Sequence, residues 1–258
     1  MFLEKMGAIQ KERVREIKAR HSMEEMEEKT ASLPPPRDFL GAIRGKHPMA
    51  LIAEIKRASP SAGAIREETN LQETAQIYQR EGAAAISVLT EPQFFHGSMM
   101  DLRQVRRETS LPLLQKDFII DAIQIYEGRL AGADAVLLIA ALLEREQIGE
   151  LARLAGRLGM TPLVEIHDEE DLEKIAGSKL SLLGINNRNL RTLEVNLNTT
   201  LRLVGQVPSE TTVISESGIR RRQDVEDLQK MGVRGILVGE VFMRAVDPAS
   251  KIRELLGR

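Results

Sequence analysis

The sequence contains no cysteine and no tryptophan among its 258 residues, and only 3% of its residues are aromatic. The absence of cysteine excludes disulfide bonds, thiolate nucleophiles and cysteine-ligated zinc. The 36 basic and 38 acidic residues leave a net charge of -2, so charge gives no indication of a nucleic-acid partner. The longest apolar run, Ala135 to Leu143, is far shorter than the roughly 20 residues that a membrane span needs. We therefore expect a cytoplasmic protein that binds neither nucleic acid nor a membrane.

Four histidines are widely spaced along the chain: His21, His47, His96 and His167. Their spacing does not match that of common zinc ligands, although distant residues can converge in a fold. We therefore predict no metal site. The first twenty residues are rich in Lys, Arg and Glu and contain no apolar core of the kind that a targeting segment needs.

After residue 50, short apolar runs alternate with longer amphipathic segments, a pattern typical of βα units in a parallel sheet. Eight strands are predicted, over residues 51–56, 83–89, 112–116, 134–139, 161–166, 181–186, 211–216 and 235–239. Eight such repeats favour a single (β/α)8 TIM barrel, with catalytic groups at the C-terminal ends of the strands. An open doubly wound sheet is the alternative, but no G-x-G-x-x-G follows the first strand.

Residues 1–45 differ from the rest of the chain. Four apolar residues fall loosely on one helical face: Met6, Ile9, Ile17 and Met26. Three prolines from Pro34 end this helix, and a short turn is expected in "RDFLGAIR". We predict an N-terminal helical extension over residues 1–45, packed on a barrel of residues 46–258. The extension is either a solvated cap that only stabilises the barrel or a lid over its mouth.

Polar side chains occupy the ends of four predicted strands. Because side chains alternate across a strand, Glu54 and Lys56 share one face with Ile52, while the other face is entirely apolar. We expect the apolar face to meet the helices, and Glu54 and Lys56 to point into the barrel and pair. The same alternation directs a further set inward: Lys116, Phe118, Glu165, Asn186 and Arg188.

Any one of these charges, taken singly, is more often a solvated residue or half of a surface pair. Their recurrence at four strand ends predicts an acid/base site. In such a site we expect burial and like-charge neighbours to lower the pKa of lysine, and burial to raise the pKa of glutamate.

The turns after the seventh and eighth predicted strands read "SESGIRRRQD" and "LVGEVFM". In TIM barrels these two loops often bind phosphate, because glycine lets backbone N–H groups approach an anion closely. The candidates are Ser215, Ser217, Gly218 and Gly239. We interpret the arginines at 220, 221 and 222 as a solvated helix start and leave them out of the site.

The segments "LIAEIKRASPSAG", "ISVLTEPQFFHGS", "LLQKDFIID", "GADAVLLIAALL", "LVEIHDEEDL", "LGINNRNL", "ISESGI" and "LVGEVFM" together resemble the indole-3-glycerol-phosphate synthase family. The likeness runs from residue 39 to the C-terminus. It implies a (β/α)8 barrel with an N-terminal helical extension and no metal or organic cofactor. Two departures, His96 where Gly is common and Gln115 where Arg is common, touch none of the proposed acid/base groups.

The resemblance also implies roles for individual residues. Lys116 would protonate the substrate ketone as the aromatic ring attacks it, and Glu165 would be the base in the later dehydration. Lys56 would hold the anthranilate carboxylate, and the resemblance leaves open which of the two lysines donates the proton in the dehydration. We expect Lys116 and Glu165 to face the substrate from opposite walls. Glu54 and Asn186 would order the polar network. The remaining substrate-binding candidates are Ser59, Phe118, Leu137, Arg188, Ser217, Gly218, Gly239 and Glu240.

The implied reaction converts 1-(2-carboxyphenylamino)-1-deoxyribulose 5-phosphate to indole-3-glycerol phosphate, carbon dioxide and water. Two alternatives stay open on the residues alone. One is another phosphosugar barrel enzyme, such as an aldolase that uses Lys116 as a Schiff-base nucleophile. The other is a barrel that binds a phosphosugar without catalysis. We expect a monomer or a weak homodimer.

Overall fold

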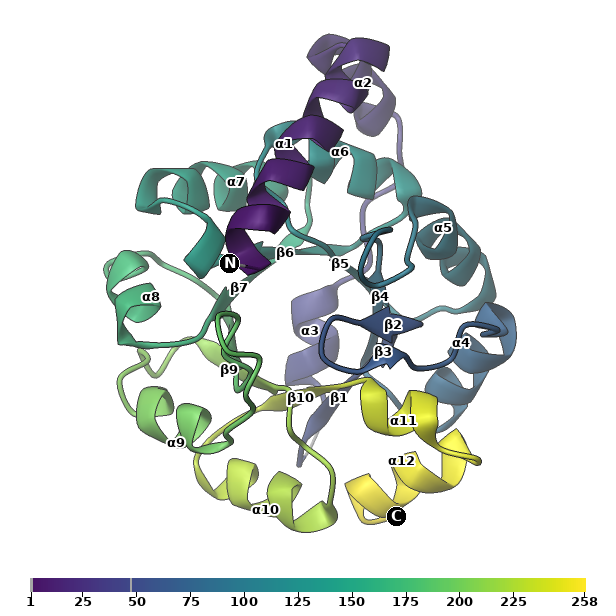
Figure 1. Ribbon diagram of the computed structural model, residues 1–258, viewed down its shortest axis with the longest axis vertical. Coiled ribbons are helices and arrows are strands. Elements are labelled where there is room, and N and C mark those ends of the chain that lie inside the picture. The colour runs from purple at the N-terminus through teal and green to yellow at the C-terminus, as the bar shows by residue number, and fades with distance from the viewer. Residues whose placement is uncertain (1, 47) are drawn as a thin grey trace.

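The computed structural model describes residues 2–46 and 48–258, so His47 lies outside the described residues. Eight parallel strands form a closed barrel in the order β1-β10-β9-β8-β7-β6-β5-β4 (Figure 1). The strands are β1 (Ala50–Ile55), β4 (Ala85–Leu89), β5 (Leu113–Lys116), β6 (Ala135–Ile139), β7 (Thr161–Ile166), β8 (Leu182–Asn186), β9 (Thr212–Glu216) and β10 (Gly235–Val238). The predicted TIM barrel and its eight strands are confirmed, and the open sheet is excluded.

Helices surround the barrel on the outside (Figure 1). They are α4 (Leu71–Arg80), α5 (Met99–Glu108), α6 (Ala122–Ala131), α7 (Arg145–Arg157), α8 (Glu169–Lys174), α9 (Asn198–Val204), α10 (Arg222–Lys230), α11 (Glu240–Arg244) and α12 (Pro248–Leu256). A short hairpin, β2 (Ala58–Ser59) and β3 (Gly63–Ala64), follows β1, and a 3-10 turn, η1 (Ala140–Leu142), follows β6. The side chains of Asn70, Ser98 and Asp121 accept hydrogen bonds from the first turns of α4, α5 and α6. Gly132 ends α6 with a φ of 97°, the left-handed cap expected before a strand.

Alternate strand residues separate two apolar layers, as the period of a strand requires. Leu51, Ala53 and Ile55 belong to the layer between strands and helices. Ala50 and Ile52 belong to the cluster inside the barrel, together with Leu114 from β5 and Leu163 from β7. Glu54, the next inward position on β1, is 4% exposed, so the predicted orientation of this strand is confirmed.

The N-terminal segment forms two helices on the side of the barrel, α1 (Phe2–Arg20) and α2 (Met23–Ala31), and both pack on α6. Met6 and Met26 are buried, as the one-sided apolar pattern predicts. Arg13 Nη1 lies 2.7 Å from Asp117 Oδ2, directly after β5. Arg13 therefore ties the middle of α1 to the end of β5, and the first residue of the helix, Phe2, lies at the rim of the barrel (Figure 1).

The expected turn in "RDFLGAIR" is wrong, because this segment forms helix α3 (Phe39–Arg44). Asp38 caps it by accepting from Gly41 N at 2.8 Å. Phe39 and Ile43, one helical turn apart, are fully buried against the starts of β1 and β4. Figure 1 shows α3 behind the barrel opening, so this helix closes the N-terminal end of the barrel.

We expect Phe39→Ala to lower the free energy of unfolding by about 3–5 kcal/mol, because it leaves a cavity at the closed end of the barrel. The measurement is chemical denaturation. Leu201→Ala is the matched control: Leu201 is 54% exposed on α9, and its loss should cost less than about 1 kcal/mol. A Phe39→Ala value as small as the control would contradict the assigned role of α3.

Candidate active site

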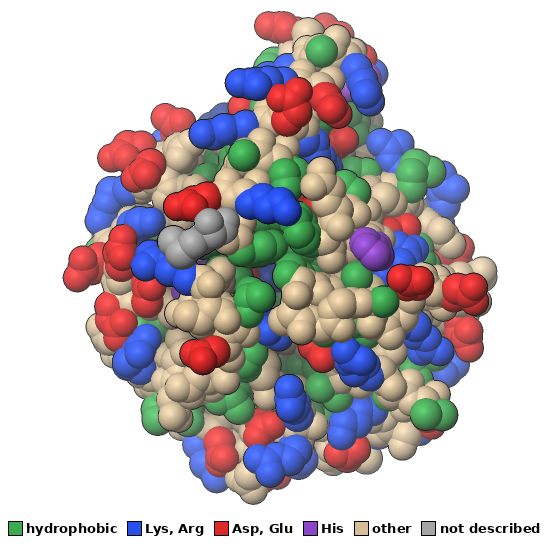
Figure 2. All heavy atoms as spheres, viewed as in Figure 1, with side chains coloured by type: hydrophobic (Ala, Val, Ile, Leu, Met, Phe, Trp, Pro, Cys, Tyr) green, Lys and Arg blue, Asp and Glu red, His purple; other side chains and the backbone are tan. Residues whose placement is uncertain are grey.

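A cavity of about 380 Å³ lies at the C-terminal ends of the barrel strands. Apolar side chains gather over the centre of this face, with lysine and arginine side chains among them (Figure 2). Every predicted site residue except Ser215 lines the cavity: Glu54, Lys56, Ser59, Lys116, Phe118, Leu137, Glu165, Asn186, Arg188, Ser217, Gly218, Gly239 and Glu240. They converge because parallel strands in a barrel all end on the same face.

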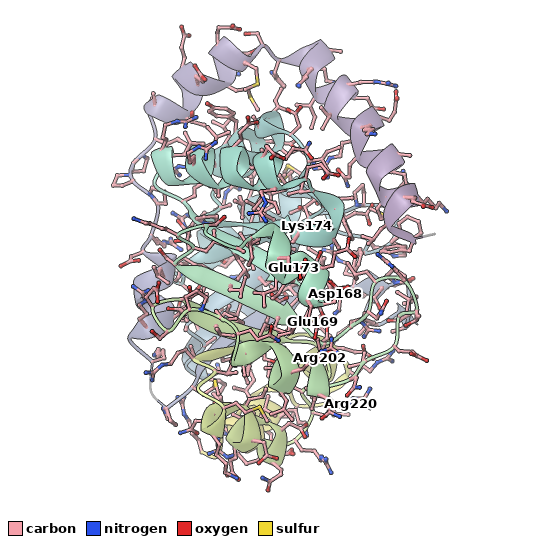
Figure 3. All side chains as sticks on the ribbon, turned by 90° about the vertical axis from the view of Figure 1, so that its left-hand side faces the viewer. Asp168, Glu169, Glu173, Lys174, Arg202 and Arg220 are labelled. Carbon is pink, nitrogen blue, oxygen red and sulfur yellow. The ribbon has the colours of Figure 1, made fainter. Side chains whose placement is uncertain are left out.

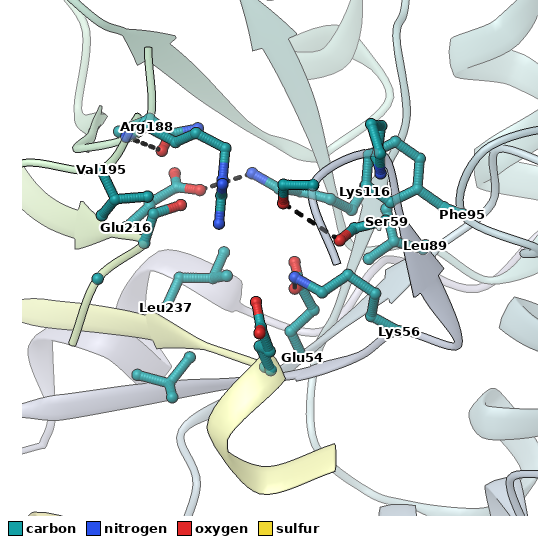
Figure 4. A pocket seen from close by; sticks show the side chains of 18 of the residues that line it. Glu54, Lys56, Ser59, Leu89, Phe95, Lys116, Arg188, Val195, Glu216 and Leu237 are labelled. Atoms are coloured by element: carbon teal, nitrogen blue, oxygen red, sulfur yellow. Dashed lines mark hydrogen bonds and ion pairs between the residues drawn. The ribbon is translucent and has the colours of Figure 1, made fainter. Parts of the chain in front are cut away.

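Lys116, the last residue of β5, connects two buried carboxylates. Its Nζ lies 2.7 Å from Glu165 Oε2 on β7 and 2.5 Å from Glu216 Oε2 on β9. Figure 4 shows the Lys116 and Glu216 head groups turned toward each other at the cavity. Lys116 and Glu165 both line the cavity, as predicted, but the expectation that they face the substrate from opposite walls is wrong. Only β6 separates their strands, and the two side chains are in direct contact.

The pKa directions of this pair are the reverse of those expected from burial. Burial is the largest influence on Lys116 and lowers its pKa, but the combined attraction of Glu165, Glu216 and Glu54 outweighs it and holds the pKa above the usual value. Burial likewise raises the pKa of Glu165, but Lys116 and His167 together hold it well below the usual range. Opposite charges within hydrogen-bond distance therefore prevail over desolvation at both groups.

The pKa of Glu216 shifts in the opposite direction from that of Glu165. Burial, the largest cause, raises its pKa, and the neighbouring Glu165 charge adds to that rise against the attraction of Lys116. Two carboxylates that share one ammonium do not ionise equally easily. Near neutral pH, Lys116 is therefore protonated, and Glu165 is the more fully ionised of the two carboxylates.

Glu54 and Lys56 form the pair that the alternation on β1 predicts. Lys56 Nζ lies 2.6 Å from Glu54 Oε1, and both side chains are largely buried. Gly239 lies so close to this pair that an added Cβ would be 2.5 Å from Glu54 Oε1. A glycine at the end of β10 therefore leaves room for the Glu54 carboxylate (Figure 4).

Ser217 and Gly218, after β9, both have positive φ, 65° and 84°. This conformation turns the chain tightly at the rim of the cavity. Ser215 does not belong there: it is fully buried, and its Oγ lies 2.8 Å from Thr200 Oγ1, behind β9. Its place as the outward residue next to Glu216 corrects its inclusion among the phosphate candidates. Arg220, expected to belong to a solvated helix start, instead lines the cavity.

Aromatic side chains cover one side of the cavity. Phe118 follows Lys116 and is 6% exposed. The ring of Phe2, from the first turn of α1, lies 5.9 Å from the Phe118 ring, and the ring of Phe95 lies 6.0 Å from it. All three rings line the cavity, and with Leu137 they make an apolar wall beside the charged groups. The N-terminal helix therefore contributes a side chain to the site.

Within residues 2–46 and 48–258, no helix combines the length and apolar character needed to cross a bilayer. Over the same ranges, no three His, Asp or Glu side chains are grouped so that they could hold a metal ion.

Comparison with known proteins identifies the family. The family model described as indole-3-glycerol phosphate synthase matches residues 3–255. The chain is 44% identical to the indole-3-glycerol phosphate synthase of Desulforamulus reducens over 257 residues, covering 99% of this chain and 97% of the relative. It is 47% identical to that of Polaromonas naphthalenivorans over 259 residues, covering 99% and 98%.

The chain belongs to the indole-3-glycerol phosphate synthase family. It is an enzyme of tryptophan biosynthesis, a carboxy-lyase that closes the indole ring with loss of carbon dioxide and water. Among solved structures, 3-hexulose-6-phosphate synthase from Salmonella typhimurium superposes with a TM-score of 0.63 at 15% identity, covering 80% of this chain and 96% of that chain. At that identity the likeness shows the barrel fold alone.

Two residues of this synthase site, Glu216 and His167, were not predicted from the sequence. Glu216 ends β9 on the same inward face as Ile214, so the alternation that located Glu165 also points to it. His167 follows β7, and its Nε2 lies 3.1 Å from Glu165 Oε1. Its signal was the four-residue spacing to Asp171 at the start of α8, a spacing that brings two side chains together in a first helical turn.

Proposed function

We propose that Lys116 is the general acid of ring closure and Glu165 the general base of the dehydration that follows. The contact that carries this proposal is the 2.7 Å pair between Lys116 Nζ and Glu165 Oε2 at the cavity. Lys116 gives a proton to the ketone oxygen while an aromatic ring carbon forms the new bond to the ketone carbon. Loss of carbon dioxide restores the aromatic ring. Glu165 then removes a proton from the carbon next to the one that bears the new hydroxyl group, while Lys56 protonates that hydroxyl so that it leaves as water.

The protonation states support this assignment. An acid must start with its proton and a base without it. Three neighbouring carboxylates keep Lys116 protonated, and Lys116 with His167 keeps Glu165 ionised. Both groups therefore start the cycle in the state that their role needs.

The two anionic ends of the substrate fit the two ends of the cavity. We assign the anthranilate carboxylate to Lys56, which is held by Glu54 at 2.6 Å. The phosphate is assigned to the positive-φ turn at Ser217 and Gly218, with Gly239 and Glu240 beside it, because such turns direct backbone N–H groups at an anion. Ser59, on the hairpin after β1, orients the substrate from that side.

The remaining candidates surround the middle of the substrate. Phe118 and Leu137 form the apolar wall against which an aromatic ring packs. Asn186 and Arg188, at the end of β8, reach the sugar hydroxyls. Arg188 is held in place by donating to Leu193 O at 3.0 Å.

We assign residues 1–45 to the N-terminal extension and residues 46–258 to the barrel. Phe2 lines the cavity, and this favours a lid over a cap that only stabilises. We propose a cytoplasmic enzyme that acts as a monomer or weak homodimer without metal or organic cofactor.

Borohydride reduction in the presence of substrate separates an acid from a nucleophile at Lys116. We expect no covalent adduct on the lysine, because an ammonium held by two carboxylates has no free electron pair to attack a carbonyl. Mass analysis of the digested protein is the measurement. A substrate-dependent mass increase on Lys116 would instead support a Schiff-base aldolase.

A further inference from the structure

His167 lies between two carboxylates at the end of β7. Its Nε2 is 3.1 Å from Glu165 Oε1, and its Nδ1 is 3.1 Å from Asp171 Oδ2. Its side chain is 7% exposed, and those of Glu165 and Asp171 are 2% and 4% exposed. The Lys116 ammonium lies on the other oxygen of Glu165, so the Glu165 carboxylate is held from both sides.

Asp171 is itself fixed by the start of α8. Its Oδ2 accepts from the backbone N of His167 at 3.0 Å, and its own N donates to Asp168 Oδ1 at 3.0 Å. Lys174 is 3.9 Å from Asp171 Oδ1, and its Nζ donates to Ala140 O at 3.2 Å. Figure 3 shows Asp168 just before α8 and Lys174 at its last position. The imidazole is thus attached to a rigid turn.

Both ring nitrogens face oxygens that only accept hydrogen bonds. A neutral imidazole carries one N–H, so it would leave one nitrogen lone pair directed at a carboxylate. An imidazolium carries two N–H groups, so Nδ1 hydrogen-bonds Asp171 and Nε2 forms an ion pair with Glu165 Oε1 at 3.1 Å. The Nε2 contact lies outside hydrogen-bond geometry, so the attraction there is electrostatic. The charged groups around the ring are Glu165 on β7, Asp171 and Lys174 on α8, and, beyond Glu165, Lys116 on β5 and Glu216 on β9. Carboxylates are the groups in direct contact.

We propose that His167, as an imidazolium anchored by Asp171, is a positioning residue for Glu165. It holds the Glu165 carboxylate ionised through Oε1 and directs Oε2, the oxygen beside Lys116, at the reacting centre. This inference rests on the proposed function of Glu165 as the base. His167 does not touch the substrate and is not among the residues lining the cavity. It acts through Glu165 alone, which distinguishes it from a residue needed only for folding.

A double-mutant cycle with His167→Gln and Glu165→Gln tests this mechanism. Glutamine keeps one donor but carries no charge. In the otherwise unchanged enzyme, we expect His167→Gln to lower kcat about tenfold or more, with KM within about threefold, because the base is misaligned. In the Glu165→Gln background the same change should alter kcat less than about twofold. His21→Gln, which removes a partly exposed histidine paired with Glu25 on α2, should change nothing.

The pH profile gives a second readout. Burial lowers the pKa of His167, but Asp171 and Glu165 together outweigh it and raise the pKa to about 9. The imidazolium is therefore present below that pH and lost as pH rises through it. We expect kcat of the unsubstituted enzyme to decline above about pH 9 and His167→Gln to lack that decline. Nitrogen NMR should show both ring nitrogens protonated at neutral pH, and Asp171→Asn should lower the pH at which the ring titrates.

The outcomes separate this inference from the proposed function. If Glu165→Gln lowers kcat a hundredfold while His167→Gln keeps kcat within twofold of the parent enzyme, the positioning role is wrong and the base assignment stands. If His167→Gln lowers kcat equally in the parent enzyme and in Glu165→Gln, His167 has a structural role, and the inference is also overturned. If Glu165→Gln itself loses less than tenfold, the base assignment fails. A neutral ring at neutral pH overturns the inference even where His167→Gln does not fold.

Discussion

Replacement of Lys116 by methionine is expected to lower turnover by at least about a hundredfold, the usual scale for losing a general acid. Methionine has a similar length but cannot donate a proton to the ketone oxygen. The loss should appear in kcat, because the step removed is proton transfer and not binding. The measurement is the initial rate of indole fluorescence increase at saturating substrate.

Lys116→Met also leaves Glu165 and Glu216 buried without their shared cation, which destabilises the fold. Circular dichroism at the assay temperature must therefore show a folded protein. Lys230→Met is the matched control, since Lys230 is exposed on α10 and pairs with the surface carboxylate of Asp227. A folded Lys116→Met enzyme that keeps more than a tenth of the parent rate would remove Lys116 from the acid role.

Glu165→Gln should also lower turnover by at least about a hundredfold, but at a different step. Glutamine keeps an oxygen for Lys116 and cannot accept the proton lost in dehydration. Because Lys116 remains, ring closure and decarboxylation proceed, and an intermediate heavier than the product by one water should accumulate. Rapid quenching followed by mass spectrometry detects it. Lys116→Met should show no such species.

Glu254→Gln, on α12 beside Lys251, is the control for this amide substitution and should leave the rate unchanged. If Glu165→Gln accumulates only unreacted substrate, Glu165 acts before ring closure and not in dehydration. If Lys116→Met and Glu165→Gln each lower turnover less than tenfold, the acid and base roles are misassigned.

Alternation along single strands predicted most of the site. Each strand is buried on its outer face, so the position of an apolar residue such as Leu51 determines that Glu54 points inward. The same parity holds for Lys116 and Glu165. The eight strands were predictable for a related reason, because a buried parallel strand is a short apolar run between polar segments.

Contacts between strands were not predictable in this way. The direct pairing of Lys116 with Glu165 depends on the register of β5, β6 and β7, which no single strand contains. The pKa directions reversed for the same reason, because they depend on partners that only the closed barrel brings close. Helix α3 was missed because six residues with a central Gly41 have weak helix propensity, and burial of Phe39 stabilises it.

The most direct test of the account is turnover by the purified chain, treated with a chelator and desalted, on 1-(2-carboxyphenylamino)-1-deoxyribulose 5-phosphate. The account predicts a rise in indole fluorescence with matching release of carbon dioxide, and loss of both in Lys116→Met. A folded, unsubstituted chain that binds this substrate and forms no indole would contradict it.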